Sequence, residues 1–533
     1  MGIIMSHALQ DRMRRFLNPD DPLGPEDAHE VEDVEVASRL FDPHNKSFNT
    51  LLRKDISVVV GRRGSGKTAL LNAYKYRQFL DPVETPDPSC NSFDYNDYDI
   101  VIDVVSYKQF YAMQQRVAGN PDEFRPIESV MEEWEDTLLD YFFGMFLDST
   151  LGRRSPPTNG DMAVIRSYLH RQVDAAKEMI WGTPLYKRLK QFLIGSETQD
   201  PPTRQDAEDA VMHYLKKTGQ KAVVIFDSMD EYPVGNEQFD RTIGALTRVI
   251  RRFNRRHDRV KIKLGLPSEI YPEVERISGN ALKDLNVDQV RWTAMELAQI
   301  AAHRFRLFLQ IHDEKQAMRV AAYDLRHREQ VHHFWRTFFP TKQKNRYSTD
   351  EDALVYIARH TQLLPRQFLR ILKRVILENT QRRAGSWFGE EAVQNAVEAE
   401  EPRIAGEIFG AFKFVYPQAE RLGRAVFGNC PTVFSFDFLE NRWRRHGRRE
   451  RESNIAMFDT VDFVDMLIRM GILGVVLKET AYYYEGKFAY DQLTPFNIGA
   501  KQLLCIHPIF SKCFNCAGNE GRKVVIPQGA WIQ

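Results

Sequence analysis

One segment constrains the fold of this chain more than any other feature: Gly61-Arg62-Arg63-Gly64-Ser65-Gly66-Lys67-Thr68. It matches the pattern G-x-x-x-x-G-K-[ST] in full. A run of mostly β-branched residues over 56–60 precedes it, and a helical pattern over 68–79 follows it. A glycine-rich turn between a buried strand and a helix predicts a phosphate-binding loop in an α/β domain with a parallel sheet.

The residue types in this loop suit the binding of a nucleotide. Glycines allow the backbone to approach phosphate oxygens closely. The loop amides and the helix N-terminus supply positive potential. Lys67 is predicted to neutralise the β- and γ-phosphates, and the Thr68 hydroxyl to ligate Mg²⁺. A chance glycine-rich turn is the alternative, but it does not explain the flanking strand and helix. The predicted nucleotide-binding residues are Gly61, Arg62, Arg63, Gly64, Ser65, Gly66, Lys67, Thr68 and Ala69.

A second group of candidate residues follows the apolar run over 222–226, which is predicted to be a buried strand. Asp227 ends this strand and is predicted to hold Mg²⁺, because a phosphate-binding loop needs a carboxylate on a neighbouring strand. Asp230 and Glu231 lie just past the strand end, and we predict that at least one of them is the general base that polarises the attacking water. The alternative is that this pair caps a helix or faces solvent. The sequence does not decide which of the two acids is the base.

The remaining patterns predict the order of the domains. Strands are predicted at 100–105 and 260–266, with helices at 127–148, 160–180, 205–217 and 238–256. The clearest helices beyond them are at 294–309, 351–360 and 366–378. A helix over 461–468 and a hairpin over 472–490 predict a winged-helix-like module. The predicted units are an irregular lead-in at 1–45 with one short helix at 34–40, a P-loop NTPase core with a parallel sheet at 46–293, a helical lid at 294–400 and a winged-helix-like α+β module at 401–533.

Composition excludes several classes of protein. The 533 residues contain 73 Lys and Arg and 73 Asp and Glu, so the net charge is zero and a generally basic nucleic-acid binder is not indicated. No apolar run reaches the ~18 residues that would span a membrane. Five cysteines fit a reducing compartment. We therefore expect a cytoplasmic protein without a membrane partner.

Three segments carry a resemblance to a known class of protein. The pattern from Val223 to Glu231 resembles the NACHT-type magnesium-binding strand of the STAND P-loop ATPases, which are related to AAA+ proteins; the usual AAA+ pattern has Glu where this chain has Ser228. Arg291-Trp292-Thr293 resembles the junction between strand and lid. The segment 363–369 resembles the sensor-2 region, where Arg366 would bring its guanidinium to the γ-phosphate. The alternative for Arg366 is a surface position at a helix start.

The resemblance covers about residues 45–380 and implies a Mg²⁺-dependent ATPase that acts as a molecular switch. It implies a homo-oligomer or an effector protein partner, as in bacterial anti-phage defence complexes. The C-terminal module also resembles those of origin-recognition and helicase-loader ATPases, which implies an alternative: a DNA-binding initiator- or loader-like ATPase. A nucleotide-binding scaffold without turnover is a third interpretation, which the Asp230-Glu231 pair opposes. The predicted cofactors are ATP and Mg²⁺, and the predicted catalytic residues are Glu231, Asp230, Lys67 and Arg366, with Thr68 and Asp227 as metal ligands.

Other residues allow weaker predictions. By resemblance, the strand at 260–266 should end in a sensor residue, but Ser268 and Glu269 are neither Asn nor Arg. The basic run 442–451 lies in the winged-helix-like module, where it could bind a phosphate backbone while Trp443 stacks on a base. Its alternatives are a solvated loop or a face for an acidic protein. A zinc site at Cys505, His507, Cys513 and Cys516 is less favoured than a packing element.

Overall fold

The structure is a computed structural model of the chain. The residues that it describes are 6–41, 56–76, 99–104, 107–119, 125–151, 160–172, 178, 181–193, 200, 202–227, 237–340, 342–345, 347–380, 388–447, 459–491, 498, 502–518 and 522–532.

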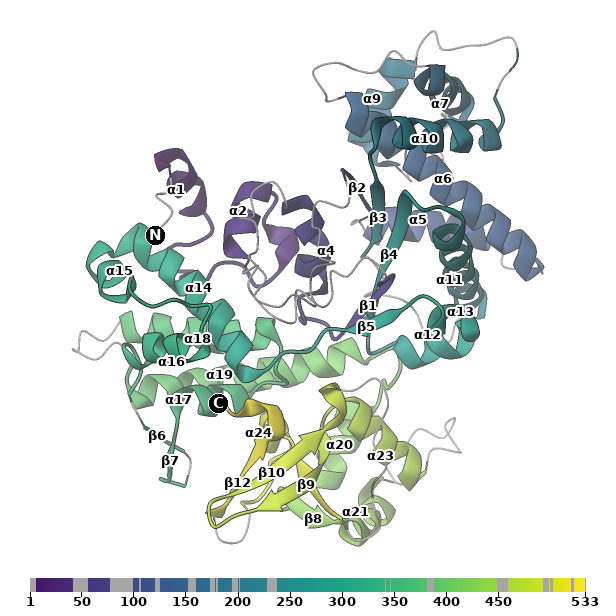
Figure 1. Ribbon diagram of the computed structural model, residues 1–533. Helices are drawn as coiled ribbons and strands as arrows, with labels where there is room; N and C mark the ends of the chain where they lie inside the picture. The colour runs from purple at the N-terminus through teal and green to yellow at the C-terminus, as the bar shows by residue number, and fades with distance from the viewer. Residues whose placement is uncertain are drawn as a thin grey trace.

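A five-stranded parallel sheet forms the centre of the P-loop core (Figure 1). Its order is β2-β3-β4-β1-β5, so β4 separates the strand before the predicted loop from the strand that carries Asp227. The strands are apolar because helices cover both faces of a parallel sheet. The fold class predicted from the sequence is confirmed. The strands are β1 Val58–Gly61, β2 Ile100–Val104, β3 Ala222–Phe226, β4 Val260–Pro267 and β5 Val287–Gln289.

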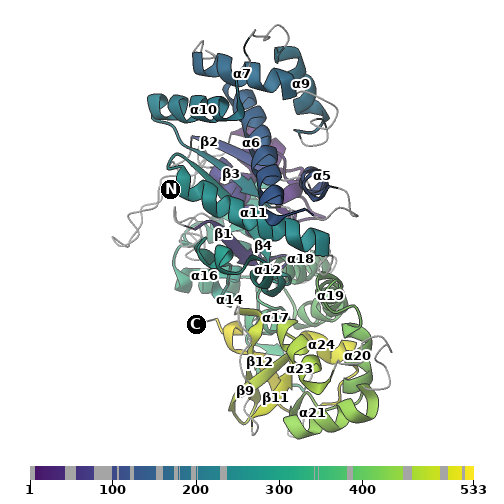
Figure 2. The same cartoon turned by 90° about the vertical axis from the view of Figure 1, so that its right-hand side faces the viewer.

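Helices surround this sheet and extend beyond its β2 edge. α11 packs against α6, α12 and β4, while α7, α9 and α10 gather with α6 at one end of the molecule (Figures 1 and 2). The predicted helix at 160–180 is present as α7 over Gly160–Gln172, and most of the predicted remainder lies outside the described residues. The helices are α4 Lys67–Tyr76, α5 Tyr107–Ala118, α6 Ile127–Leu151, α7 Gly160–Gln172, α9 Thr183–Leu193, α10 Arg204–Thr218, α11 Glu237–Arg256, α12 Tyr271–Ser278 and α13 Asn280–Lys283.

The lid is helical apart from a short two-stranded ribbon, β6 and β7. Its core is continuous with that of the C-terminal module, so the two units share one set of buried apolar side chains. The lid elements are α14 Ala294–His312, α15 Glu314–Val320, α16 Arg328–Arg336, β6 Gln343–Lys344, β7 Asp350–Glu351, α17 Ala353–Arg359, α18 Pro365–Thr380 and α19 Glu390–Ala411.

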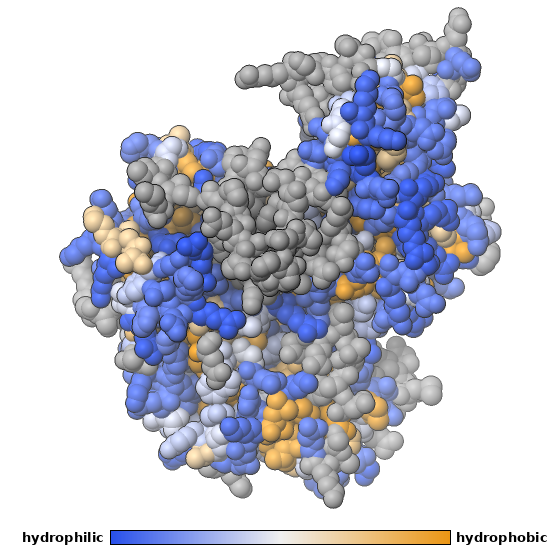
Figure 3. Space-filling view, viewed as in Figure 1, coloured by the Kyte–Doolittle hydropathy of each residue, from blue (hydrophilic) through white to orange (hydrophobic). Residues whose placement is uncertain are grey.

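The C-terminal module has the element order helix, strand, helix, helix and hairpin, which is that of a winged helix. Two further strands complete a sheet of order β12-β10-β9-β11-β8. On the face shown in Figure 3, apolar residues gather over this module, whereas the rest of the described surface is mostly hydrophilic. The elements are α20 Ala419–Phe427, β8 Val433–Ser435, α21 Phe436–Arg442, α23 Thr460–Arg469, β9 Leu473–Glu479, β10 Tyr483–Phe488, β11 Leu503–Ile506, α24 Pro508–Cys513 and β12 Val524–Pro527.

The N-terminal lead-in differs from the irregular segment that the sequence predicts. The predicted short helix is present as α2 Val34–Leu40, and it is joined by α1 His7–Met13 and a 3₁₀ turn, η1 Ala28–Glu30. Leu9, Met13 and Leu17 pack with Leu307 and Ile311 of α14. Buried apolar contacts therefore hold the lead-in against the lid. The sequence did not predict this packing, because the apolar runs of the lead-in are short and interrupted by prolines. Among the described residues, no helix is long and apolar enough to cross a membrane.

Candidate nucleotide-binding site

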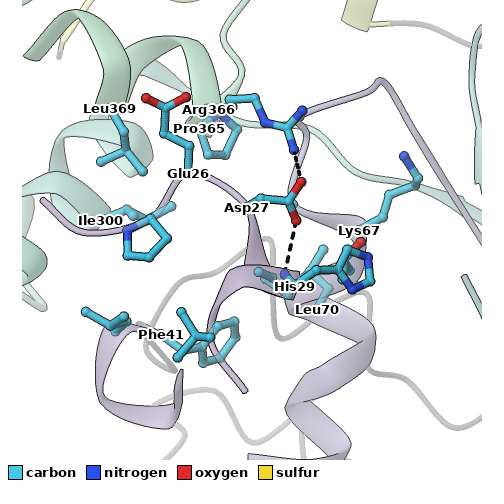
Figure 4. A pocket seen from close by; sticks show the side chains of 18 of the residues that line it. Glu26, Asp27, His29, Phe41, Lys67, Leu70, Ile300, Pro365, Arg366 and Leu369 are labelled. Carbon is cyan, nitrogen blue, oxygen red and sulfur yellow. Dashed lines mark hydrogen bonds and ion pairs between the residues drawn. The ribbon is translucent and has the colours of Figure 1, made fainter. Parts of the chain in front are cut away.

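A cavity of about 320 Å³ lies at the carboxyl edge of the parallel sheet, beside the glycine-rich loop. Three parts of the chain line it: the loop and the start of α4, the N-terminal segment from 25 to 41, and the lid helices α14 and α18 (Figure 4). Ligands of open α/β sheets bind at this edge of the strands. The apolar lining includes Val31, Leu40, Phe41, Ile300 and Leu369.

The loop has the shape that encloses a phosphate. Gly64 and Gly66 have φ values of +83° and +86°, a region that favours glycine. Lys67 is 5% exposed, and its Nζ donates to the carbonyl oxygens of Gly61 at 3.0 Å and Arg62 at 3.3 Å. The ammonium therefore lies inside the loop rather than in solvent.

Asp227 is buried at the end of β3, two strands away from the loop. Gly265 of β4 makes room for it, because a Cβ atom there would lie 2.5 Å from the Asp227 Oδ1 atom. Burial lowers the pKa of Lys75 to about 8, and the negative charge of Asp227 opposes that shift. Thr68 lines the cavity from the first turn of α4. Asp227 is not among the residues that line the cavity. Thr68 and Asp227 both carry the hard oxygen atoms that suit Mg²⁺.

The two predicted bases, Asp230 and Glu231, lie outside the described residues. Their role in activating water stays a prediction.

Arg366 lies beside the loop, at the first turn of α18. Its backbone N–H donates to the Gly64 carbonyl at 3.4 Å, and a Cβ atom on Gly64 would come within 3.1 Å of the Arg366 Cβ atom. Its guanidinium pairs with Asp27 at 2.7 Å (Figure 4). The side chain therefore reaches the cavity, where its partner in this structure is an acid of the N-terminal segment.

Sequence reasoning missed the acids of the N-terminal segment. Besides Asp27, Glu26 pairs with Arg370 and Asp21 with Lys373, so three successive basic positions on α18 meet three acids. The spacing of four and three residues along α18 places its cations on one helix face. The acidic character of the lead-in was visible in the sequence, but its partners lie more than 300 residues away.

Two further contacts join the loop to its surroundings. Glu269, at the end of β4, is 6% exposed and accepts a hydrogen bond from the Arg63 N–H at 2.9 Å. Trp292 donates from its indole nitrogen to the Ser65 carbonyl at 2.7 Å. The predicted sensor position is thus occupied by a carboxylate that binds the loop itself, and the predicted strand-to-lid junction contacts the loop directly.

Arg62, predicted to bind the cofactor, directs its side chain out of the cavity and into contact with the lid and the C-terminal module. Its backbone carbonyl accepts a hydrogen bond from the Lys67 ammonium at 3.3 Å.

The basic run at 442–451 is only partly available to a ligand. Arg442 donates to the carbonyls of Val426 and Gly428, and Arg444 pairs with Glu440. Trp443 is 2% exposed and stacks on Phe463, so the prediction that it stacks on a base is wrong. The apolar ring is more stable in the module core than in solvent. Arg445 is exposed, and residues 448–451 lie outside the described part of the chain.

The cysteine and histidine residues near the C-terminus form a packing element. His507 is fully buried against Phe488 and Tyr490 and accepts a hydrogen bond from the Ile509 N–H. Within the described ranges, no group of three or more His, Cys, Asp or Glu residues could hold a metal ion.

Comparison with known proteins gives likenesses at low similarity. No family model matches the sequence, and no curated protein matches it. The chain is similar in structure to the Orc1 protein of Aeropyrum pernix, solved in complex with DNA, with 12% identity, a TM-score of 0.31 and coverage of 96% of this chain and 93% of that one. It is also similar to Cdc6p of Pyrobaculum aerophilum, with 11% identity, a TM-score of 0.26 and coverage of 93% and 97%.

A third similar structure is the ORC2 protein of Aeropyrum pernix in ADPNP–ADP complexes, with 10% identity, a TM-score of 0.28 and coverage of 91% and 93%. The identities and TM-scores of all three likenesses are low. The STAND-specific part of the resemblance stays a prediction.

Proposed function

We propose that this chain is a Mg²⁺-dependent ATP-binding and ATP-hydrolysing switch of the AAA+-related P-loop class. The observation that supports this most directly is the Lys67 ammonium, buried inside a loop of positive-φ glycines at a cavity closed by the lid. A buried cation at the N-terminus of a helix is suited to a polyphosphate.

Each part of the site has its own proposed role in binding the nucleotide. Lys67 and the loop amides bind the β- and γ-phosphates, Thr68 and Asp227 hold Mg²⁺, and the apolar end of the cavity near Phe41 accepts the base. When bound, Mg²⁺ neutralises charge that develops on the phosphate oxygens. Arg366 reaches the γ-phosphate once its pair with Asp27 is broken, so the lid senses which nucleotide is present.

Asp230 and Glu231 are proposed to supply the general base. Glu231→Gln or Asp230→Asn should keep ATP binding but lower turnover by about 10²–10⁴-fold, because each removes a proton acceptor without removing the magnesium ligand. Steady-state phosphate release and nucleotide titration on the same preparations measure the two effects. Wild-type turnover in both variants would exclude the pair as the base.

Two interpretations concern the function of the whole protein. We favour a DNA-binding initiator- or loader-like ATPase over a STAND switch in phage defence. The supporting observation is the winged-helix order of α20, β8, α21, α23 and the β9–β10 hairpin, directly joined to the lid. The exposed side of α23 carries Asp462 and Asp465, which phosphates would repel. The basic run that precedes α23 is therefore the proposed contact.

DNA binding through this run predicts a steep salt dependence. Replacing Arg445, Arg448 and Arg449 together by Ser should weaken binding to a labelled duplex and reduce the slope of log K against log salt by about 0.9 for each lost phosphate contact. Arg442→Ser is the matched control for structure, because Arg442 already donates to backbone carbonyls. Absence of wild-type binding at low salt in fluorescence anisotropy would contradict the DNA interpretation and leave the ATPase proposal intact.

A further inference from the structure

Arg62 is the second residue of the glycine-rich loop, yet its side chain belongs to another part of the molecule. It is 6% exposed, and its guanidinium donates to the carbonyl oxygens of Met470 at 3.2 Å and Arg469 at 2.5 Å. It also donates to the side-chain oxygen of Gln362. These partners lie 300 to 408 residues away in sequence.

The carbonyls that Arg62 binds are those left over at the C-terminal end of α23. Gly471 has φ +68°, its N–H donates to the Ile468 carbonyl, and the Ile472 N–H donates to the Leu467 carbonyl. This is the Schellman arrangement, which leaves the carbonyls of the last two residues for other donors. A cation is stabilised there by the negative end of the helix dipole. Arg62 thus caps α23.

The rings of Phe412 and Tyr490 lie 5.6 and 5.7 Å from the Arg62 guanidinium carbon. A cation over aromatic faces is attracted by their electron density, more strongly when it is shielded from water. Phe412 follows α19 of the lid, and Tyr490 follows the β9–β10 hairpin of the module. One aromatic ring beside the lid and one in the module therefore offset part of the cost of removing the Arg62 charge from water.

Gln362 makes the contact a junction of three parts. Its side-chain nitrogen donates to the carbonyls of Met470 at 2.9 Å and Gly471 at 3.2 Å, while its oxygen accepts from Arg62. It lies four residues before Arg366 and three residues before the start of α18. The loop, the lid and the C-terminal module therefore meet at these side chains.

The backbone of Arg62 lies on the phosphate side of the same junction. The peptide unit between Arg62 and Arg63 offers its carbonyl to the Lys67 ammonium at 3.3 Å and its N–H to the Glu269 carboxylate at 2.9 Å. A bound phosphate would compete for both partners, since it attracts the ammonium and repels the carboxylate. The same carbonyl also accepts a hydrogen bond from the Ser65 N–H at 2.9 Å. Because a phosphate would change two of the three contacts of this peptide unit, we expect binding at the loop to shift the backbone of Arg62.

We infer that Arg62 is the coupling residue that links occupancy of the phosphate-binding loop to the docking of the C-terminal module. This inference rests on the proposed nucleotide binding. The contact with α23 depends on the position of this peptide unit, so a shift of the unit on phosphate binding should lengthen the contact and loosen the module. By linkage, loss of the contact should also favour nucleotide binding by the same factor.

Hydrogen exchange of the full chain, with and without Mg²⁺-ATP, tests the coupling at the Gly471 and Ile472 amides. In the wild type, ATP should speed exchange there by at least about fivefold, the lower range of typical coupling energies.

Arg62→Lys keeps the charge but loses the forked geometry. It should reduce the ATP effect to less than about twofold and tighten ATP binding by about fivefold. Gln362→Leu removes the lid's hydrogen bonds at the same contact. It should also reduce the ATP effect on exchange and tighten ATP binding.

The matched control is Arg442→Lys, which alters another arginine that donates to two backbone carbonyls at a helix end within the module. It should leave both the ATP effect and the ATP affinity unchanged. ATP binding without any change of exchange at these amides, or an equal effect of Arg442→Lys, would overturn the inference and leave the proposed function standing. Failure of the wild type to bind ATP would overturn both.

Discussion

At the scale of single residues, internal acids hold two hydrogen-bond donors beside the loop. The guanidinium of Arg366 is 2.7 Å from Asp27, and the Arg63 N–H is 2.9 Å from Glu269. Phosphate oxygens would use these same two donors. Under the proposed function, each acid would therefore compete with a nucleotide for its donor.

Asp27→Asn tests this competition. The amide should retain the cap that Asp27 provides to the His29 N–H but lose the charge that holds Arg366. We expect ATP to bind about two- to fivefold more tightly, as for a partly exposed ion pair, with a smaller effect on ADP. Titration calorimetry with both nucleotides measures the difference. Glu26→Gln, which breaks the neighbouring pair with Arg370, is the control. An equal change for ATP and ADP would contradict a contact of Arg366 with the γ-phosphate.

At the scale of elements, α24 shows how a helix cap can depend on protonation. His507 is the N-cap of this helix and is fully buried. Burial lowers the pKa of His507 to about 3, and the positive charges of Arg62 and Arg359 add to the shift. The neutral ring is needed both as an acceptor for the Ile509 N–H and as a part of the apolar core.

The low pKa of His507 predicts that the module loses stability in acid. Between pH 6.5 and 3 the unfolded chain binds a proton at this residue and the folded chain does not, so stability falls as the pH falls through that window. The loss should be about 2 kcal/mol between pH 7 and 5. His507→Asn keeps a capping oxygen and removes the titration, so its urea midpoint should change less with pH. Equal pH dependence of both proteins, followed by circular dichroism, would contradict this account.

At the scale of the whole molecule, the sequence predicted what local patterns determine. Unbroken apolar runs placed β1, β2, β3 and β4 to within a few residues, and the loop motif placed Lys67 and Thr68 at the cavity, but the short strand β5 was not predicted. The pairing of Asp27 with Arg366 and the contact of Arg62 with α23 were not predictable. Both join segments more than 300 residues apart, and neither leaves a local pattern. Strands β11 and β12 were missed for the same reason, since their partners are set by tertiary packing.

This arrangement makes the loop the structural centre of the chain. The lid reaches it through Arg366, the junction between core and lid through Trp292, and the C-terminal module through its contact with Arg62. The lead-in is joined to it indirectly, through the pair of Asp27 with Arg366. A ligand at the loop would therefore contact or displace groups from every major part of the molecule. That is the property that a nucleotide-driven switch requires, because a ligand shifts a conformational equilibrium only through differential contacts.

The most direct test is calorimetric titration of the wild type and of Lys67→Ala with Mg²⁺-ATP. The wild type should bind one nucleotide per chain. The variant should bind at least about 100-fold more weakly, because it loses a charge-assisted contact to the phosphates in a buried site. Lys373→Ala, on the lid surface outside the cavity, should bind like the wild type. Absence of binding by the wild type, or equal binding by the Lys67→Ala variant, would contradict the assignment of this loop as the nucleotide site.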